Sequence, residues 1–315
     1  MEIRMGEYSG INSTPCPTNA VQTNEDSAVK VVAGVNGTLD SEAVAVIYEK
    51  SGRTESNTYS VDSVQAAIPE GALNSKMKTY LKDLGFYNGE LGSEYTEEFK
   101  KALKCFQNAY FGAVIYSVNN KVLEKLQEKI ESVGAAYYTN YTNNKLTDAL
   151  KKLGFANPTT ENKQNFARIQ TFLEKGMGCN KYQTAGIMGN IMQESGFSPK
   201  AVNSKSGAFG IIQWNGIRKT YLNKYASKNG YSSADNMGIQ FAYFRYEMSR
   251  TWRKGDIDEN APNSDLVKNW NTIKNEYKPS YYAVSDFFKD NIEGCNDNTY
   301  QIRRNYSSII YQAIS

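Results

Sequence analysis

The stretch between residues 182 and 214, YQTAGIMGNIMQESGFSPKAVNSKSGAFGIIQW, constrains the fold most, because it marks both ends of a helix. Asn180 and Gln183 have the spacing of a capping box, which starts a helix. Gly196 is a residue type that ends one. We expect a helix between these signals, followed by a glycine-rich β-hairpin at 206–214, where the backbone can approach a ligand closely.

Glu194 is the carboxylate that this helix presents. It shares one helical face with Ile187 and Ile191, because the three positions are spaced i, i+4 and i+7. A carboxyl group set against apolar side chains resists ionisation, and its pKa rises. A carboxyl group that keeps its proton near neutral pH can act as a general acid, so Glu194 is the candidate catalytic acid.

Three motifs follow one another here: AGIMGN at 185–190, QESGF at 193–197 and GAFGIIQW at 207–214. Together they resemble the phage tail lysozymes of the lysozyme-like superfamily and, more distantly, the lytic transglycosylases and goose-type lysozymes. In that family the Glu of the Glu-Ser pair is the catalytic acid, and the G-x-x-Q segment lines the sugar groove. The resemblance implies a mainly α fold with a C-terminal lysozyme-like α+β domain, made of helices and a small β-hairpin.

The resemblance also implies which residues bind the sugar. These come from the end of the helix, the hairpin and the later stretch QFAYFRYEM, and they are Ser195, Gly207, Phe209, Gly210, Gln213, Tyr243 and Tyr246. Trp214 is expected in the core. Glu247 is the best candidate for a second catalytic carboxylate, although a solvated Glu is an equal alternative. The adjacent Arg303 and Arg304 are expected on a solvated face.

The composition excludes several other chemistries. The chain has no histidine, whereas Ser-His-Asp and Cys-His nucleophilic sites and zinc amidases all need imidazole. The net charge of +3 is too small to argue for nucleic acid as a partner. The longest apolar run, 43–48, is too short to span a membrane, and the first residues lack the apolar core of a signal peptide. No metal and no organic cofactor is implied.

The four cysteines are widely separated. Because Cys16, Cys105, Cys179 and Cys295 form no CxxC pattern, a zinc site is not expected. Cys179 and Cys295 fall in the same predicted domain and could pair, but two buried free thiols are the favoured alternative.

The rest of the chain divides into three further segments. Residues 1–72 are expected to be an attachment segment, β-rich or extended, with β-prone runs at 29–35 and 43–48 around an Asn-Gly turn signal. Residues 73–133 contain three helical patterns around the motif LGFYNG. In that order they resemble a three-helix peptidoglycan-binding domain, with a three-helix spacer as the alternative. A polar linker at 134–158 then leads to the catalytic domain at 159–315.

The substrate implied is the glycan strand of bacterial peptidoglycan, cut at the β-1,4 bond between N-acetylmuramic acid and N-acetylglucosamine. Glu194 would protonate the glycosidic oxygen. A lysozyme then needs a second carboxylate, whereas a lytic transglycosylase can use one Glu and the substrate's own 6-hydroxyl. The sequence leaves both routes open.

Three settings fit this chemistry. The first is an enzyme on a phage tail or similar injection device, held by tail proteins through the N-terminal region and made in the host cytoplasm without a signal peptide. The second is a released endolysin acting at the extracellular cell wall. The third is a tail structural protein that binds glycan without cutting it. The presence of both Glu194 and Gln213 argues against the third.

Overall fold

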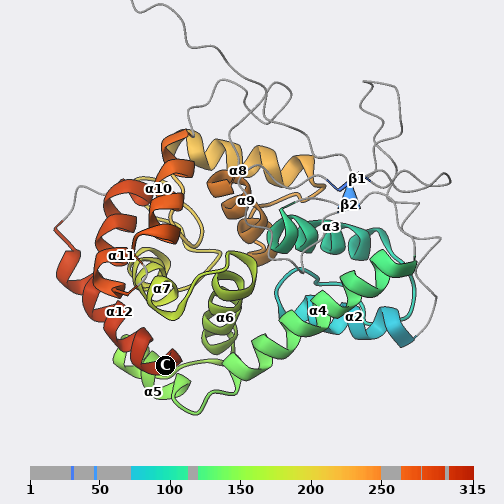
Figure 1. Ribbon diagram of the computed structural model, residues 1–315, viewed down its shortest axis with the longest axis horizontal. Coiled ribbons are helices and arrows are strands. Elements are labelled where there is room, and N and C mark those ends of the chain that lie inside the picture. Colours follow the sequence, from blue (N-terminus) through green and yellow to red (C-terminus); the bar gives the residue numbers. More distant parts are fainter. Residues whose placement is uncertain are drawn as a thin grey trace, which may run out of the picture.

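The computed structural model describes residues 30–31, 46–47, 72–112, 120–249, 264–277, 279–294 and 298–315. These residues are mainly helical and form eleven α-helices, labelled α2 to α12, and two short π-helical segments (Figure 1). None of the described helices is long and apolar enough to cross a membrane.

Two two-residue strands are the elements described near the N-terminus. β1 (Lys30–Val31) pairs antiparallel with β2 (Val46–Ile47), with Lys30 opposite Ile47. Both strands fall within the β-prone runs expected from the sequence. The remaining residues up to 71, including Cys16, lie outside the described residues, so an attachment role for this segment stays a prediction.

Three helices follow, as the periodicity of residues 73–133 predicts. They are α2 (Ala72–Asp83), α3 (Glu97–Phe111) and α4 (Asn120–Tyr141). Thr96 caps the start of α3 by accepting a hydrogen bond from the backbone of Phe99. Gly112 ends the helix in the left-handed conformation.

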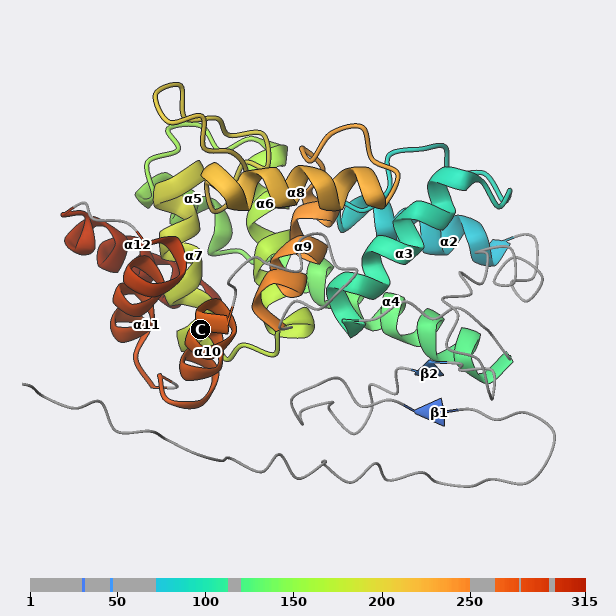
Figure 2. The same ribbon diagram turned by 90° about the horizontal axis from the view of Figure 1, so that it is seen from above.

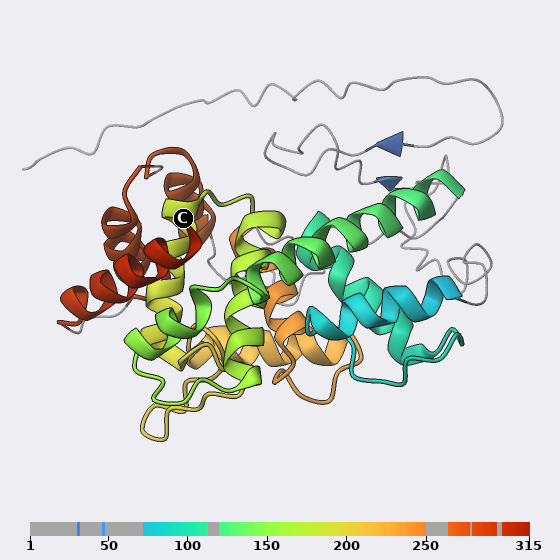
Figure 3. The ribbon, with the colours of Figure 1, turned by 90° about the horizontal axis from the view of Figure 1, so that it is seen from below.

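The linker expected at 134–158 is largely helical instead. The helix α4 continues to Tyr141, and α5 (Leu146–Lys152) follows after a short turn. Although this stretch reads as polar, Tyr137 of α4 and Leu146 and Leu150 of α5 are buried, the last two at a helical spacing of four residues. Core packing of these few side chains therefore overrides the polar composition of the segment. Figure 3 shows the long ribbon of α4 and, after a turn, the short ribbon of α5.

The C-terminal half is built around one central helix. Its elements are α6 (Thr160–Thr171), the π-helical η1 (Phe172–Gly176), α7 (Lys181–Ser195), α8 (Gly216–Lys228), α9 (Met237–Ser249), α10 (Ser264–Asn275), α11 (Tyr281–Phe288), the π-helical η2 (Lys289–Glu293) and α12 (Tyr300–Ile314). α11 and α12 both pack along α7 (Figure 1).

The hairpin expected at 206–214 does not form strands. Phe209 makes isolated β-bridges to Val202 and to Trp214, and the rest of the segment is a series of turns. Gly207, Gly210 and Gln213 all have positive φ. Because the backbone changes direction at each of them, it cannot stay extended for long enough to form a ladder of β-sheet hydrogen bonds. The described part of the fold is therefore mainly α, and the expected α+β character of the C-terminal domain is not seen.

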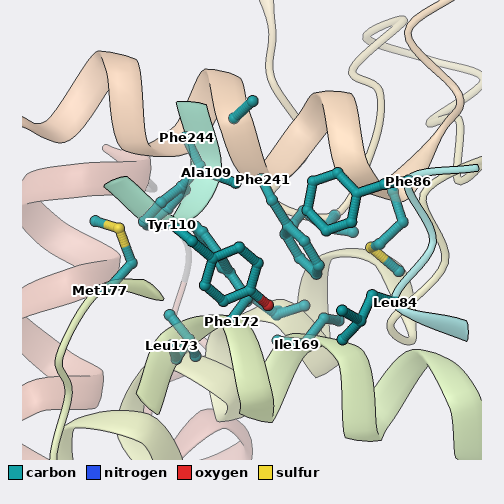
Figure 4. Packing of buried hydrophobic residues seen from close by; sticks show 14 of the residues in the cluster. Leu84, Phe86, Ala109, Tyr110, Ile169, Phe172, Leu173, Met177, Phe241 and Phe244 are labelled. Atoms are coloured by element: carbon teal, nitrogen blue, oxygen red, sulfur yellow. The ribbon is translucent and has the colours of Figure 1, made fainter. Parts of the chain in front are cut away.

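The middle helices and the C-terminal helices share one hydrophobic core. Phe241 of α9 stacks on Phe172 with ring centres 4.3 Å apart, and it also contacts Phe86, which precedes α3. Figure 4 shows Tyr110 of α3 in the same cluster. In Figure 2, α10–α12 lie at one end of the molecule and α2–α4 at the other, with α6 and α9 between them. The domain boundary predicted near residue 159 is therefore not a break in the core.

Candidate active site

The helix α7 begins and ends where the sequence predicts. The side chain of Asn180 accepts from the backbone N–H of Gln183, and the side chain of Gln183 accepts from that of Asn180, at 2.9 and 3.0 Å. Gly196 closes the helix with φ of 56°. These caps place Glu194 in the last turn of α7.

Glu194 contacts a guanidinium group. Ile187 and Ile191 are buried as predicted, but the carboxylate of Glu194 accepts a hydrogen bond from Nη2 of Arg303. The side chain of Glu194 is 16% exposed, so it reaches the surface from a mostly buried position. The sequence predicts the buried isoleucines on this helical face, but it does not predict the ion pair of Glu194 at the edge of the core.

Arg303 is buried, contrary to the solvated face expected for it, with only 1% of its side chain exposed. The four positions 303, 307, 310 and 314 of α12 all turn inward, a heptad-like spacing that the sequence already displays. Arg304 is the one that lies at the surface, where it pairs with Asp286 of α11.

A set of hydrogen bonds fixes the guanidinium of Arg303. Nη1 donates to Oδ1 of Asn190 at 2.9 Å, and Nε donates to Oγ1 of Thr299 at 2.8 Å. Asn190 is itself held, because its amide donates to the carbonyl oxygens of Gly186 and Ser285 at 3.0 Å. The cation therefore has a fixed place beside the end of α7.

Sequence reasoning missed a second carboxylate next to Glu194. Glu293, at the end of η2, accepts from Nη1 of Arg303 at 2.7 Å, and its side chain is 2% exposed. Two carboxylates thus bind one guanidinium from different sides. No local motif marks Glu293, because it reaches the site through a π-helical segment far along the chain.

Glu247, the predicted second carboxylate, lies elsewhere in the core and is 1% exposed. It accepts from Nε and Nη2 of Arg218 at 2.7 and 2.8 Å, and from the indole N–H of Trp214 at 3.1 Å. This burial excludes the alternative of a solvated Glu. Trp214 is in the core as expected.

Arg218 connects this carboxylate to the first site. Its Nη1 donates to the carbonyl oxygen of Ile292 at 2.6 Å, next to Glu293. Burial alone would lower the pKa of Arg218, but the negative charges of Glu247 and, more weakly, of Glu293 raise it overall. Charges of alternating sign therefore run from Glu194 to Glu247.

The glycine-rich loop between Gly207 and Trp214 is tied to the end of α7. The hydroxyl of Ser195 lies 2.9 Å from the carbonyl oxygen of Ile211. The buried Gln240 accepts from the backbone N–H of Ile211 at 3.0 Å, and its own amide donates to Pro199 and Ala234. These contacts hold the loop beside Glu194.

Gly210 is required at its place in the loop. It has φ of 82°, and a Cβ there would lie 2.8 Å from Oε1 of Gln240. The side-chain amide of Gln213 donates to the carbonyl oxygens of Ala201 and Gly210, so it helps to close the turn. The shape of the loop is therefore set by two amide side chains: the partly exposed Gln213 within the motif and the buried Gln240 outside it.

The predicted sugar-binding residues separate by exposure. Those partly exposed near the end of α7, in the loop or on α9 are Ser195, Gly207, Phe209, Gln213 and Tyr246. Tyr243 and Gly210 are both buried. The hydroxyl of Tyr243 lies 3.3 Å from the carbonyl oxygen of Arg218. Within the described residues no group of three or more acidic, cysteine or histidine side chains could hold a metal ion.

The comparison with protein families covers this same region. Residues 163–314 match the model of the phage tail lysozyme family. The matched part runs from α6 to the end of α12 and contains Glu194, Glu293 and Arg303, which confirms the family resemblance of the C-terminal region. The middle helices lie outside the match. No curated protein and no solved structure gave a match.

Proposed function

We propose that this chain is a phage tail lysozyme that cleaves the β-1,4 bond between N-acetylmuramic acid and N-acetylglucosamine in peptidoglycan. The observation that carries the proposal is the position of Glu194. It lies at the end of the capped helix α7, is partly exposed, stands beside the tied loop at 207–214, and falls within the family match. The match supports a lysozyme-like activity on the cell wall.

In the proposed reaction Glu194 gives a proton to the glycosidic oxygen while the sugar acquires oxocarbenium character. The partly exposed side chains of Phe209 and Tyr246 offer surfaces for sugar rings, and Gln213 offers an amide for an N-acetyl or hydroxyl group. Ser195 and Gly210 act indirectly, since they hold the loop in place.

The environments of the other carboxylates favour the single-Glu route. Glu247 is enclosed by Arg218 and Trp214, and Glu293 lies behind Arg303. Neither presents an exposed oxygen surface to a bound sugar, whereas hydrolysis requires a second carboxylate beside the scissile bond. We therefore favour attack by the substrate's own 6-hydroxyl, with Glu194 taking back a proton as the base.

The expected setting is a phage tail or similar injection device, where the enzyme opens the wall locally. The N-terminal 71 residues supply enough chain for attachment to tail proteins. A released endolysin with the same chemistry is the alternative. Co-assembly of the chain with tail proteins would favour the tail enzyme, whereas lysis of cells by the free chain would favour the endolysin.

Replacing Glu194 with Gln tests the function. The change keeps the shape of the side chain but removes the transferable proton, so we expect wall-degrading activity to fall at least about a hundredfold. Zymograms on cell-wall gels and release of soluble muropeptides measure it. Glu161→Gln is the matched control, because Glu161 is an exposed carboxylate on α6. Near-normal turnover by Glu194→Gln would refute the assignment.

Mass spectrometry of the muropeptides decides the route. The single-Glu reaction leaves 1,6-anhydro ends, whereas hydrolysis leaves reducing ends. Reducing ends alone, together with an inactive but folded Glu247→Gln variant, would favour a lysozyme with Glu247 as its second catalytic carboxylate.

A further inference from the structure

A hollow of about 310 Å³ opens at the surface between α11 and α12. It is lined by one residue of α11, Tyr282, and by four residues of α12, which are Gln301, Arg304, Asn305 and Ser308. The two helices pack against each other at one end of the molecule (Figure 1). The volume lies within the range of pockets that bind small ligands, about 300–1,000 Å³.

The α11–α12 hollow and the candidate active site use different faces of α12. Arg303 turns into the core, where it binds Glu194, and 1% of its side chain is exposed. The next residue, Arg304, lines the hollow, and 41% of its side chain is exposed. A molecule in the hollow would therefore be held apart from the catalytic acid.

The polar groups of the hollow suit an uncharged ligand. Nε of Arg304 donates to Oδ1 of Asp286 at 2.9 Å, and Nη2 donates to Oδ2 of the same carboxylate. This ion pair balances the charge of the guanidinium group and fixes its plane. Gln301 and Asn305 are exposed and lie four residues apart, so their side-chain amides fall on the same side of α12. Amides bind the hydroxyl and amide groups of a ligand as donors and as acceptors.

Tyr282 adds an aromatic wall that other tyrosines support. Its ring centre lies 4.4 Å from that of Tyr281, which stacks at 4.9 Å on Tyr311 of α12, and Tyr311 stacks at 4.7 Å on Tyr182 of α7. Although 45% exposed, Tyr282 is thus held at one end of a series of rings from three helices. An aromatic ring that is fixed at the surface offers an apolar face beside a polar hydroxyl group.

The geometry points to a second glycan-binding site in the α11–α12 hollow, which takes an N-acetylated sugar of the peptidoglycan strand away from the bond that is cut. Such a sugar has an apolar ring face for Tyr282, and hydroxyl and N-acetyl groups for Gln301 and Asn305. Binding at this second point raises the effective concentration of the strand at Glu194. The inference rests on the proposed function in one respect, that wall glycan is the substrate.

Binding to purified sacculi tests the site. In a chain that carries Glu194→Gln, so that the wall stays intact, adding Gln301→Ala and Asn305→Ala should weaken binding about tenfold, because two hydrogen-bonding side chains are lost. Gln312→Ala is the matched control, since Gln312 is an exposed amide on the same helix outside the hollow. Unchanged binding by the double variant would overturn the inference.

A spectroscopic probe of the otherwise unchanged chain does not depend on other contacts with the wall. Adding an oligomer of N-acetylglucosamine to ¹⁵N-labelled protein should shift the side-chain amide signals of Gln301 and Asn305, which are assigned from their loss in the alanine variants. The side-chain signal of Gln312 should stay in place. Signals of Gln301 and Asn305 that do not move would overturn the inference.

Kinetics on sacculi separate this site from the catalytic one. With Glu194 present, the double variant should keep its maximal rate but need about tenfold more sacculi to reach half of it, because the reacting groups are unchanged. A lower maximal rate with the same half-saturation would overturn the inference. Active Glu194→Gln together with shifted amide signals would refute the proposed catalytic role and leave the glycan site standing, whereas inactive Glu194→Gln with unmoved signals would do the reverse.

Discussion

Two thiols in the core show how burial controls reactivity at single residues. Burial raises the pKa of Cys105 to about 12, despite opposing contributions from Tyr231 and Lys104, and it raises that of Cys179 to about 11. The thiolate is the reactive form, so both side chains are inert near neutral pH. Cys179 is a free thiol in the structure, and Cys295 lies outside the described residues.

We expect Cys105 and Cys179 to resist alkylation by iodoacetamide at pH 8 in the folded chain and to react fully in guanidinium chloride. The same raised pKa values predict a stability contribution that is complete below about pH 8.5 and is lost as pH rises toward 11 or 12, because the unfolded chain releases these protons first. Peptide mapping after labelling reports each site. Rapid labelling of the native thiols, or a 179–295 disulfide peptide, would contradict this.

At the scale of elements, two glycines let the helices around α7 approach closely. A Cβ on Gly186 would lie 2.7 Å from the carbonyl oxygen of Tyr281 on α11. One on Gly189 would lie 2.8 Å from that of Arg303 on α12. Backbone therefore packs against backbone on two sides of α7. The close approach of α12 is what brings Arg303 to Glu194.

Gly189→Ala should therefore destabilise the fold, although alanine is the better helix former by up to about 1 kcal/mol. Overpacking costs about 1–3 kcal/mol, and the shift of α12 should also lower activity. Thermal and urea unfolding measure the change. Gly92→Ala is the control, because a Cβ there meets no atom within 4 Å. A higher unfolding midpoint for Gly189→Ala would contradict this prediction, because it would mean that α12 moves to accommodate the added methyl group at little cost in free energy.

Local signals predicted the elements of this fold better than its electrostatics. The ends of α7 could be predicted, because the capping box and Gly196 act within a few residues. The burial of Arg303 could have been predicted from its spacing with Ser307 and Ile310, but its charge argued for the surface. Glu293 could not, since its place depends on how η2 packs after the whole chain has folded.

The whole molecule buries its middle helices against the region that matches the family. Phe86 and Tyr110 pack against Phe172 and Phe241 in one aromatic cluster (Figure 4). The middle helices thus form part of the hydrophobic core that covers the C-terminal region, whether or not they also bind glycan.

A chain shortened to begin at residue 159 should therefore aggregate, or unfold well below the intact chain. Removing the middle helices exposes large aromatic side chains to water, and each such side chain that loses its burial costs about 1.5–3 kcal/mol of folding free energy. Calorimetry and size-exclusion chromatography on both chains measure this. Equal midpoints and a soluble monomer for the short chain would show that the C-terminal region folds independently.

The ends of the middle helices are completed by side chains from the C-terminal half. Arg168 of α6 donates to the carbonyl oxygen of Asp83, which ends α2, and Arg245 of α9 donates to that of Ala109 on α3. Replacing this segment with one from another protein would therefore also require replacing both arginines and the facing aromatic side chains. The part of the chain that packs as one unit therefore extends from α2 to α12, and is longer than the stretch that matches the family model.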